Sequence, residues 1–185
     1  MLRLGRVTLR PFRTEDAAAR AALGRDAQIS RMFGGSPDWV GNRPMDARDG
    51  QDWLDQVTND GNPHHWAVEV DSRFVGAARL HDLDKADRRA RYAVGLFDAL
   101  LLGQGLGTEI TRCVLTHAFD DLGLHRVDLR VLSFNHRAIA SYLKCGFVEE
   151  GREREAAFVD GAWHDDVIMG ILAHEFADHD DTSAL

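Results

Sequence analysis

The residues best suited to chemistry in this sequence are three alternating glycines, Gly103, Gly105 and Gly107, within residues 102–108. An extended apolar run over residues 92–97 precedes them, and an amphipathic helical pattern follows. Because glycine has no Cβ, successive backbone N–H groups can turn toward one point. The start of a helix adds unpaired N–H groups and the positive end of the helix dipole. The order strand, glycine loop, helix therefore predicts a cradle for a phosphate or pyrophosphate.

Two common nucleotide-binding loops do not fit this stretch. A P-loop requires Lys and then Ser or Thr after its last glycine, whereas Thr108 and Glu109 follow Gly107. A Rossmann fingerprint that starts at Gly103 requires a glycine where this chain has Thr108. Taken alone, the glycine pattern is also compatible with a tight turn between a strand and a helix.

Most of the elements predicted for the N-terminal third of the chain are helices. A first strand over Val7–Arg10 ends at a proline, and Thr14, Glu15 and Asp16 open a helix that runs to Leu23. Further helices are expected over residues 26–32 and 46–57. Alternating apolar residues then predict a meander of three antiparallel strands, over residues 66–70, 73–80 and 92–97.

The second half alternates helices and strands. The helix after the glycine loop extends to Gly123, with its apolar face at Ile110, Val114, Leu115, Ala118, Phe119 and Leu122. A strand over residues 126–132 and a helix between Asn135 and Gly146 follow. Asp160 and Gly161 predict a hairpin between the last two strands. The fold class is therefore α+β, with a mixed sheet flanked by helices.

Length and composition fit one globular domain. The chain has 185 residues, of which 44% are hydrophobic and 28% charged. We expect a single domain over residues 1–176 and a disordered acidic tail over residues 177–185. No apolar run approaches the roughly 20 residues that span a bilayer, and the N-terminus has no secretory apolar region. The expected compartment is the cytoplasm, without a membrane partner.

The net charge, the cysteines and the histidines indicate which ligands and partners to expect. The net charge of −8 argues against a nucleic-acid partner and suits a cationic substrate such as an amine, although it equally serves solubility. Cys113 and Cys145 are expected in helices as buried, reduced thiols. His64 and His65 point to opposite faces of a strand, so we expect no metal site there.

A second pattern follows the glycine loop and its helix. It has the form Asn-x-x-Ala-x-x-x-Tyr-x-x-x-Gly-Phe, at Asn135, Ala138, Tyr142, Gly146 and Phe147. Together the two motifs resemble the GCN5-related N-acetyltransferase (GNAT) family, and its Rim-type branch in particular, over roughly residues 7 to 176. Further matches to the branch are Leu9, Arg10, Pro11, Glu150, Gly151, Asp160, Gly161, Asp166 and Met169.

This resemblance implies a GNAT fold, with a mostly antiparallel, splayed central sheet, and acetyl-CoA as cosubstrate without a metal. The glycine loop would hold the pyrophosphate, although Leu102 replaces the polar Gln or Arg that usually begins it. A slot beside Gly95 would take the pantetheine, and backbone groups of the strand would polarise the thioester carbonyl. The implied cofactor-binding residues are Val94, Leu96, Phe97, Leu102, Gly103, Gln104, Gly105, Leu106, Gly107, Thr108, Asn135 and Ala138.

Tyr142 is the catalytic residue that the resemblance implies. Transfer of an acetyl group to an amine expels a thiolate, and a tyrosine hydroxyl can donate a proton or hydrogen bond to that sulfur. Asn135 lies seven residues earlier, close to the same helix face. Without the motif, Tyr142 is also readable as a core tyrosine, and Asn135 as a helix cap.

The general base is not identified by the sequence. Many relatives have a Glu on the strand before the glycine loop, where this chain has Ala93, and others have one on the following strand, where it has Asp128 or Arg130. A chain of water molecules could also remove the proton. The remaining candidates are Glu69, His81, Asp82 and His164, of which His81 and Asp82 are expected to border the slot.

The sequence thus predicts an acetyl-CoA-dependent N-acetyltransferase that works by direct transfer in a ternary complex. The acceptor is a primary amine of a protein N-terminus, polyamine, amino acid or antibiotic, and a homodimer is common in the branch. A non-catalytic acyl-CoA-binding or regulatory domain is the alternative. An acetylator of aminoacyl-tRNA is disfavoured, because the acidic chain has no basic stretch.

Overall fold

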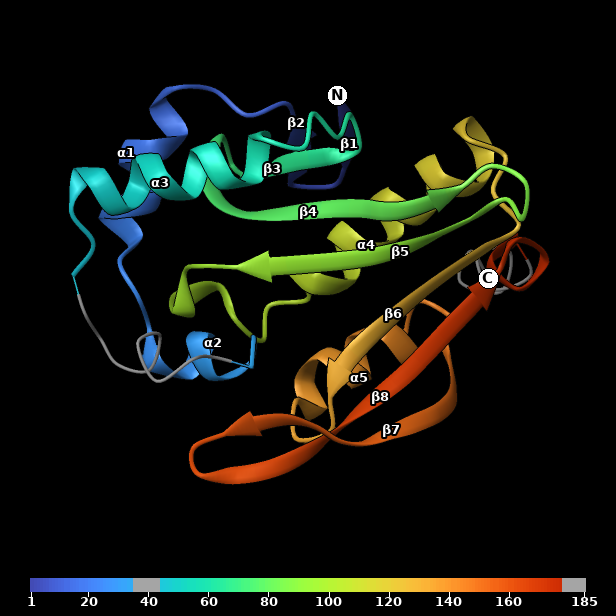
Figure 1. The fold of residues 1–185 in the computed structure, drawn as a ribbon. Helices are drawn as coiled ribbons and strands as arrows, with labels where there is room; N and C mark the ends of the chain where they lie inside the picture. The colour runs from blue at the N-terminus through green and yellow to red at the C-terminus, as the bar shows by residue number, and fades with distance from the viewer. Residues whose placement is uncertain (35–43, 178–185) are drawn as a thin grey trace.

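A twisted eight-stranded sheet forms the centre of the molecule, in a computed structural model that describes residues 1–34 and 44–177 (Figure 1). The strand order is β1-β2-β3-β4-β5-β6-β8-β7, and every neighbouring pair is antiparallel except β5 and β6. The strands are β1 (Leu2–Leu4), β2 (Val7–Arg10), β3 (His65–Val70), β4 (Arg73–Asp84), β5 (Arg89–Leu96), β6 (Arg126–Leu132), β7 (Val148–Val159) and β8 (Ala162–Leu172).

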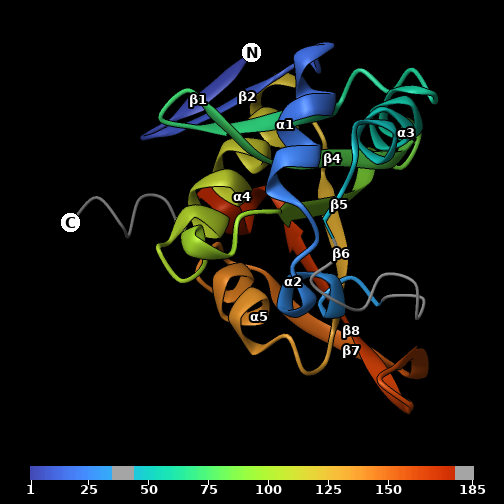
Figure 2. The ribbon, with the colours of Figure 1, turned by 90° about the vertical axis from the view of Figure 1, so that its left-hand side faces the viewer.

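Helices cover both faces of this sheet. Figure 2 shows α4 and α5 on one side of the sheet and α3 on the other. The apolar residues of β6, Val127, Leu129 and Val131, are buried together with the apolar face of α4. The helices are α1 (Glu15–Leu23), α2 (Ala27–Arg31), α3 (Ala47–Thr58), α4 (Leu106–Thr116) and α5 (His136–Leu143), with a 3₁₀ turn over Ala99–Leu101 and a π-helical turn over His117–Asp121.

The predicted α+β class and the predicted helices and strands are confirmed, with local differences. The N-terminal strand β1 was not predicted, because three residues are too short to show an alternating pattern. The long helix after the glycine loop changes to a π-helical turn at His117, where the Leu122 N–H donates to the His117 carbonyl. The two cysteines are buried and form no disulfide, as predicted, although Cys145 lies in the turn after α5 rather than inside it.

The predicted acidic tail is only partly described. The chain is helical over residues 173–177, so Ala177 does not belong to a disordered tail, and residues 178–185 lie outside the described residues. Within the described part, none of the helices is long and apolar enough to cross a membrane.

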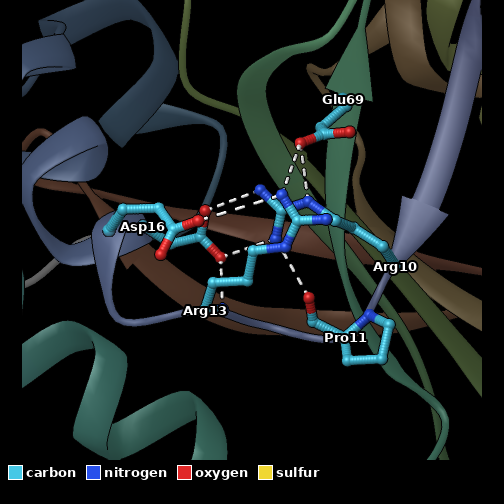
Figure 3. Close-up of polar contacts among 6 residues, drawn as sticks. Arg10, Pro11, Arg13, Asp16 and Glu69 are labelled. Atoms are coloured by element: carbon cyan, nitrogen blue, oxygen red, sulfur yellow. Dashed lines mark hydrogen bonds and ion pairs between the residues drawn. The ribbon is translucent and has the colours of Figure 1, made fainter.

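A buried ion-pair cluster joins β2, β3 and α1 (Figure 3). The Arg10 guanidinium donates to both carboxylate oxygens of Asp16, at 2.7 and 2.8 Å, and to Glu69 at 2.6 Å. Asp16 also accepts the Arg13 backbone N–H at 2.7 Å, whereas Thr14, which occupies the N-cap position, makes no side-chain capping bond. The start of α1 is therefore held by Asp16. The carboxylates of Asp16 and Glu69 together raise the pKa of Arg10.

Candidate active site

The candidate site is a cavity of about 530 Å³ in the gap between β5 and β6. These two strands pair in parallel only from Arg89↔Arg126 to Arg91↔Asp128, and the rest of β5 diverges from β6. Figure 1 shows the gap widening toward α2, with α5 beside it. The splayed sheet is therefore confirmed, and it opens a space between two strands that other folds would close with hydrogen bonds.

Backbone groups on the diverging part of β5 face this gap. The Phe97 N–H donates to the Val75 carbonyl, which makes Gly76↔Leu96 a pair that exchanges no hydrogen bonds. Two residues along, Ala78↔Val94 has the same character. The N–H and C=O groups of Val94 and Leu96 therefore point away from β4, toward the gap, where a ligand can use them.

The glycine loop closes one end of the cavity with a row of backbone donors. Gly103 and Gly105 have φ of 79° and 81°, and Gly105 is the N-terminal cap of α4. Among the described residues, no acceptor takes the N–H groups of residues 103–107, whereas the next two N–H groups donate to the Gly105 carbonyl. Consecutive free N–H groups at a helix start attract an anion, so this loop fits a phosphate group.

One face of α5 forms another wall of the cavity. The Asn135 side chain caps the helix by accepting the Ala138 N–H at 3.2 Å, so its role as a cap is confirmed. Ser141 bonds the Thr108 hydroxyl at 3.0 Å and so fixes α5 against the start of α4. The residues of this wall are Asn135, Arg137, Ala138, Ser141, Tyr142 and Lys144.

Tyr142 lies at the junction of this wall with the core. Its ring packs against Tyr92 and Phe147, with centroids 6.3 and 5.8 Å away. Its side chain is buried, yet its hydroxyl has no hydrogen-bond partner among the described residues. Burial raises the pKa of this hydroxyl, so it stays protonated at neutral pH and can donate but not accept a proton.

The structure brings together ten of the twelve residues expected to bind the cofactor. Phe97 and Gln104 do not line the cavity: the Phe97 ring lies under the Arg20 guanidinium, and the Gln104 amide donates to the Leu100 carbonyl. Leu102 lines the cavity with extended backbone. The residues that line it are Val94, Leu96, Leu102, Gly103, Gly105, Leu106, Gly107, Thr108, Asn135 and Ala138.

Gly95 lines the cavity, so a slot does lie beside it as expected. The β4–β5 register runs without a break through Ala77↔Gly95, so the slot opens on the other side of β5, toward β6. A Cβ on Gly95 would lie 2.7 Å from the Phe33 ring. A side chain at position 95 would therefore require the Phe33 ring, which follows α2, to move away from β5.

The expected base candidates lie elsewhere, and none of the four is among the described residues that line the cavity. Glu69 is paired with Arg10, and the His164 ring packs on Phe134. His81 and Asp82 were expected just beyond the end of a strand, but β4 continues to Asp84. They therefore lie opposite Arg91, where β5 is still paired with β6, and not at the slot.

The sequence reasoning did not place four charged residues, or the apolar residues that cover the cavity, at this site. Arg137 and Lys144 are seven residues apart, so helical spacing places them on one side of α5 and its C-terminal cap. Asp166 and Arg130 are brought in by β8 and β6, through strand pairing that no local pattern reveals. Ile29, Met32 and Phe33 enter from α2 and its C-terminal turn.

Metal ligation has no support in the described part of the chain, where no three His, Cys, Asp or Glu side chains gather. The two adjacent histidines do diverge: His64 packs beside Trp66, and His65 packs on Phe12.

Comparison with known proteins gives a consistent result. Residues 6–148 match the acetyltransferase (GNAT) domain family. The putative ribosomal N-acetyltransferase YdaF of Bacillus subtilis is 32% identical over 126 residues, which cover 68% of this chain and 67% of that protein. The spermidine N(1)-acetyltransferase of Escherichia coli K12 is 27% identical, over 94% of this chain and 90% of its own.

The comparison of the fold with solved structures agrees with the comparison of the sequence. The structure of Mycobacterium smegmatis RimJ in complex with CoA-disulfide superposes with a TM-score of 0.79, over 96% of this chain and 89% of that chain, at 24% identity. The family match covers the strand, the glycine loop and the α5 motif that frame the cavity. The chain therefore belongs to the GNAT acetyltransferase family, on its Rim-type branch, and is an acetyl-CoA-dependent N-acetyltransferase.

Proposed function

We propose that this protein moves the acetyl group of acetyl-CoA directly to a primary amine while both substrates are bound. The observation that carries the proposal is the convergence of three features on one cavity: the free N–H groups of residues 103–107, the backbone of Val94 and Leu96, and Tyr142. Each suits a different part of the donor, from its pyrophosphate to its thioester.

The size and the charge of this cavity both support acetyl-CoA as the donor that it binds. A volume of about 530 Å³ is typical of a small-molecule site. The N–H groups of the glycine loop would hold the pyrophosphate, and Arg137 and Lys144 add positive charge to the same region of α4 and α5. The pantetheine would lie along the open edge of β5, where its amides can bond Val94 and Leu96.

The residues support transfer without a covalent enzyme intermediate. A backbone N–H on the open edge of β5 would polarise the thioester carbonyl, as a preorganised oxyanion site does. Tyr142 would donate to the departing sulfur. Both cysteines are buried and neither is among the described cavity-lining residues, so the described lining has no thiol nucleophile.

The acceptor would be a small-molecule amine or a peptide N-terminus. One relative is a spermidine acetyltransferase and another a putative ribosomal acetyltransferase, which supports both classes as candidates. The test is release of CoA thiol from acetyl-CoA with a panel of polyamines, monoamines, amino acids, aminoglycosides and N-terminal peptides. We expect turnover with at least one class. Acetyl-CoA binding without any turnover would instead favour a non-catalytic acyl-CoA-binding domain.

Gly105→Ala is expected to weaken acetyl-CoA binding several-fold. An added Cβ meets no atom within 4 Å, but alanine at φ 81° costs about 1–2 kcal/mol, so the loop will relax and its N–H groups will turn away. Gly161 in the β7–β8 turn also has φ 81° and the same free space, which makes Gly161→Ala a matched control. Calorimetry should show a raised Kd for acetyl-CoA only with Gly105→Ala; equal Kd values would contradict the cradle.

A further inference from the structure

Asp166 is the one carboxylate among the described residues that line the cavity. It lies on β8, directly opposite Leu132 on β6. The next residue, Val167, is fully buried toward α4 and α5, so Asp166 points to the opposite face of the sheet. Residues at the end of α2 cover that face: a Cβ on Gly34 would lie 3.9 Å from Leu132.

The described part of the fold makes no use of this carboxylate. No hydrogen bond or ion pair joins the Asp166 carboxylate to another described residue. Its neighbour Asp165, by contrast, accepts the Glu155 N–H at 3.0 Å, and Arg130 is paired with Glu153 at 2.6 Å. Burial raises the pKa of Asp166, Arg130 opposes that shift and Glu153 adds to it. A half-buried carboxylate without a partner is costly unless a ligand supplies one.

Asp166 also lies on the correct side for an acceptor. Side chains alternate along β5, so Ala93 and Gly95 face away from α4, toward the same side of the sheet as Asp166. The glycine loop and α5 occupy the other side. An amine that enters beside Asp166 therefore approaches the edge of β5 from the face opposite the proposed donor cradle.

We propose that Asp166 binds the ammonium group of the acceptor and takes its first proton. The inference rests on the proposed transferase function. The neutral nitrogen then forms the N–C bond with the acetyl carbonyl carbon as the C–S bond breaks, and the Tyr142 hydroxyl donates to the sulfur. The second proton lost by nitrogen restores Tyr142, and the proton on Asp166 leaves to solvent. The reaction therefore consumes one ammonium ion and one thioester, and it forms one amide, one thiol and one free proton.

The surroundings of Asp166 indicate the class of amine. Beside it the cavity is apolar, with Met32, Phe33, Leu132 and Ala157, and the other charged residues of the described lining are cations. A second ammonium would meet Arg130 and no further carboxylate of the described lining. The site therefore suits a primary amine on an uncharged, apolar arm better than a polyamine.

The test compares Asp166→Asn with wild type, using phenethylamine and spermidine as acceptors. At pH 7 we expect Asp166→Asn to lower kcat/KM for phenethylamine by about 100-fold, the size of a lost general base, with an unchanged Kd for acetyl-CoA. The loss should shrink above pH 9, where more of the amine is already neutral. Asp165→Asn is the matched control, because asparagine keeps the oxygen that accepts the Glu155 N–H.

Wild type should prefer phenethylamine to spermidine in kcat/KM. A preference for spermidine overturns the assigned amine class. An Asp166→Asn variant with wild-type kcat/KM, or with a loss that is the same at pH 7 and above pH 9, overturns the role of the carboxylate. If wild type acetylates no amine at all, the proposed function itself fails, whereas turnover that is indifferent to Asp166 defeats only this inference.

Discussion

Tyr142→Phe is expected to lower kcat by about 100-fold and to leave the Kd of acetyl-CoA within about twofold of wild type. The substitution removes only the hydroxyl, so the ring contacts with Tyr92 and Phe147 remain. Burial raises the pKa of this hydroxyl, which keeps it protonated and ready to donate across the neutral range. CoA thiol release measures the turnover, and calorimetry with acetyl-CoA measures the binding.

Tyr92→Phe is the control for this experiment. Tyr92 packs against Tyr142, but its hydroxyl bonds the Thr111 side chain at 3.1 Å on the α4 side. Its loss should cost about 1 kcal/mol of stability and change kcat only a few-fold. Equal losses of kcat in the two variants would mean that packing around the pair, and not proton donation by Tyr142, limits the reaction.

The parts of the site that were predictable are local in sequence. A strand, a glycine loop and a helix start follow one another over residues 92–108, so their order alone placed a row of N–H donors at one point. Tyr142 and Asn135 were assigned through the resemblance to the GNAT family, whose motif lies within one short segment of the chain at and after the start of α5. Phe97 and Gln104 were predicted to bind the cofactor because they lie beside lining residues in sequence, but their side chains point elsewhere.

The acceptor side was not predictable from local pattern. Asp166 and Leu132 are 34 positions apart and meet only through the β6–β8 register, and the Phe33 ring approaches β5 at Gly95, 62 positions further along the chain. The error at His81 and Asp82 has the same origin, because the length of β4 is set by pairing with β5 and not by its own alternation. Pairing between strands that are distant in sequence decides which side chains share a cavity, and local patterns in the sequence do not reveal that pairing.

The second large effect concerns stability. Asp16→Ala is expected to lower the free energy of unfolding by about 3–5 kcal/mol, the usual cost of removing one partner from a buried ion pair. Arg10 and Asp16 are only 3% and 1% exposed, so water cannot replace the lost carboxylate. The variant also removes the acceptor of the Arg13 N–H that begins α1. Urea unfolding with a shared m-value measures the difference.

Glu15→Ala provides the matched control, one residue away on the same helix. The Glu15 side chain is 69% exposed and lies 3.8 Å from an exposed Arg13, so we expect its loss to change stability by less than about 0.5 kcal/mol. Asp16→Asn should fall between the two, because it keeps the size and one acceptor but not the charge that faces Arg10. If Asp16→Ala costs no more than Glu15→Ala, Glu69 alone satisfies the Arg10 guanidinium, and α1 is held to the sheet by apolar packing instead of by this ion pair.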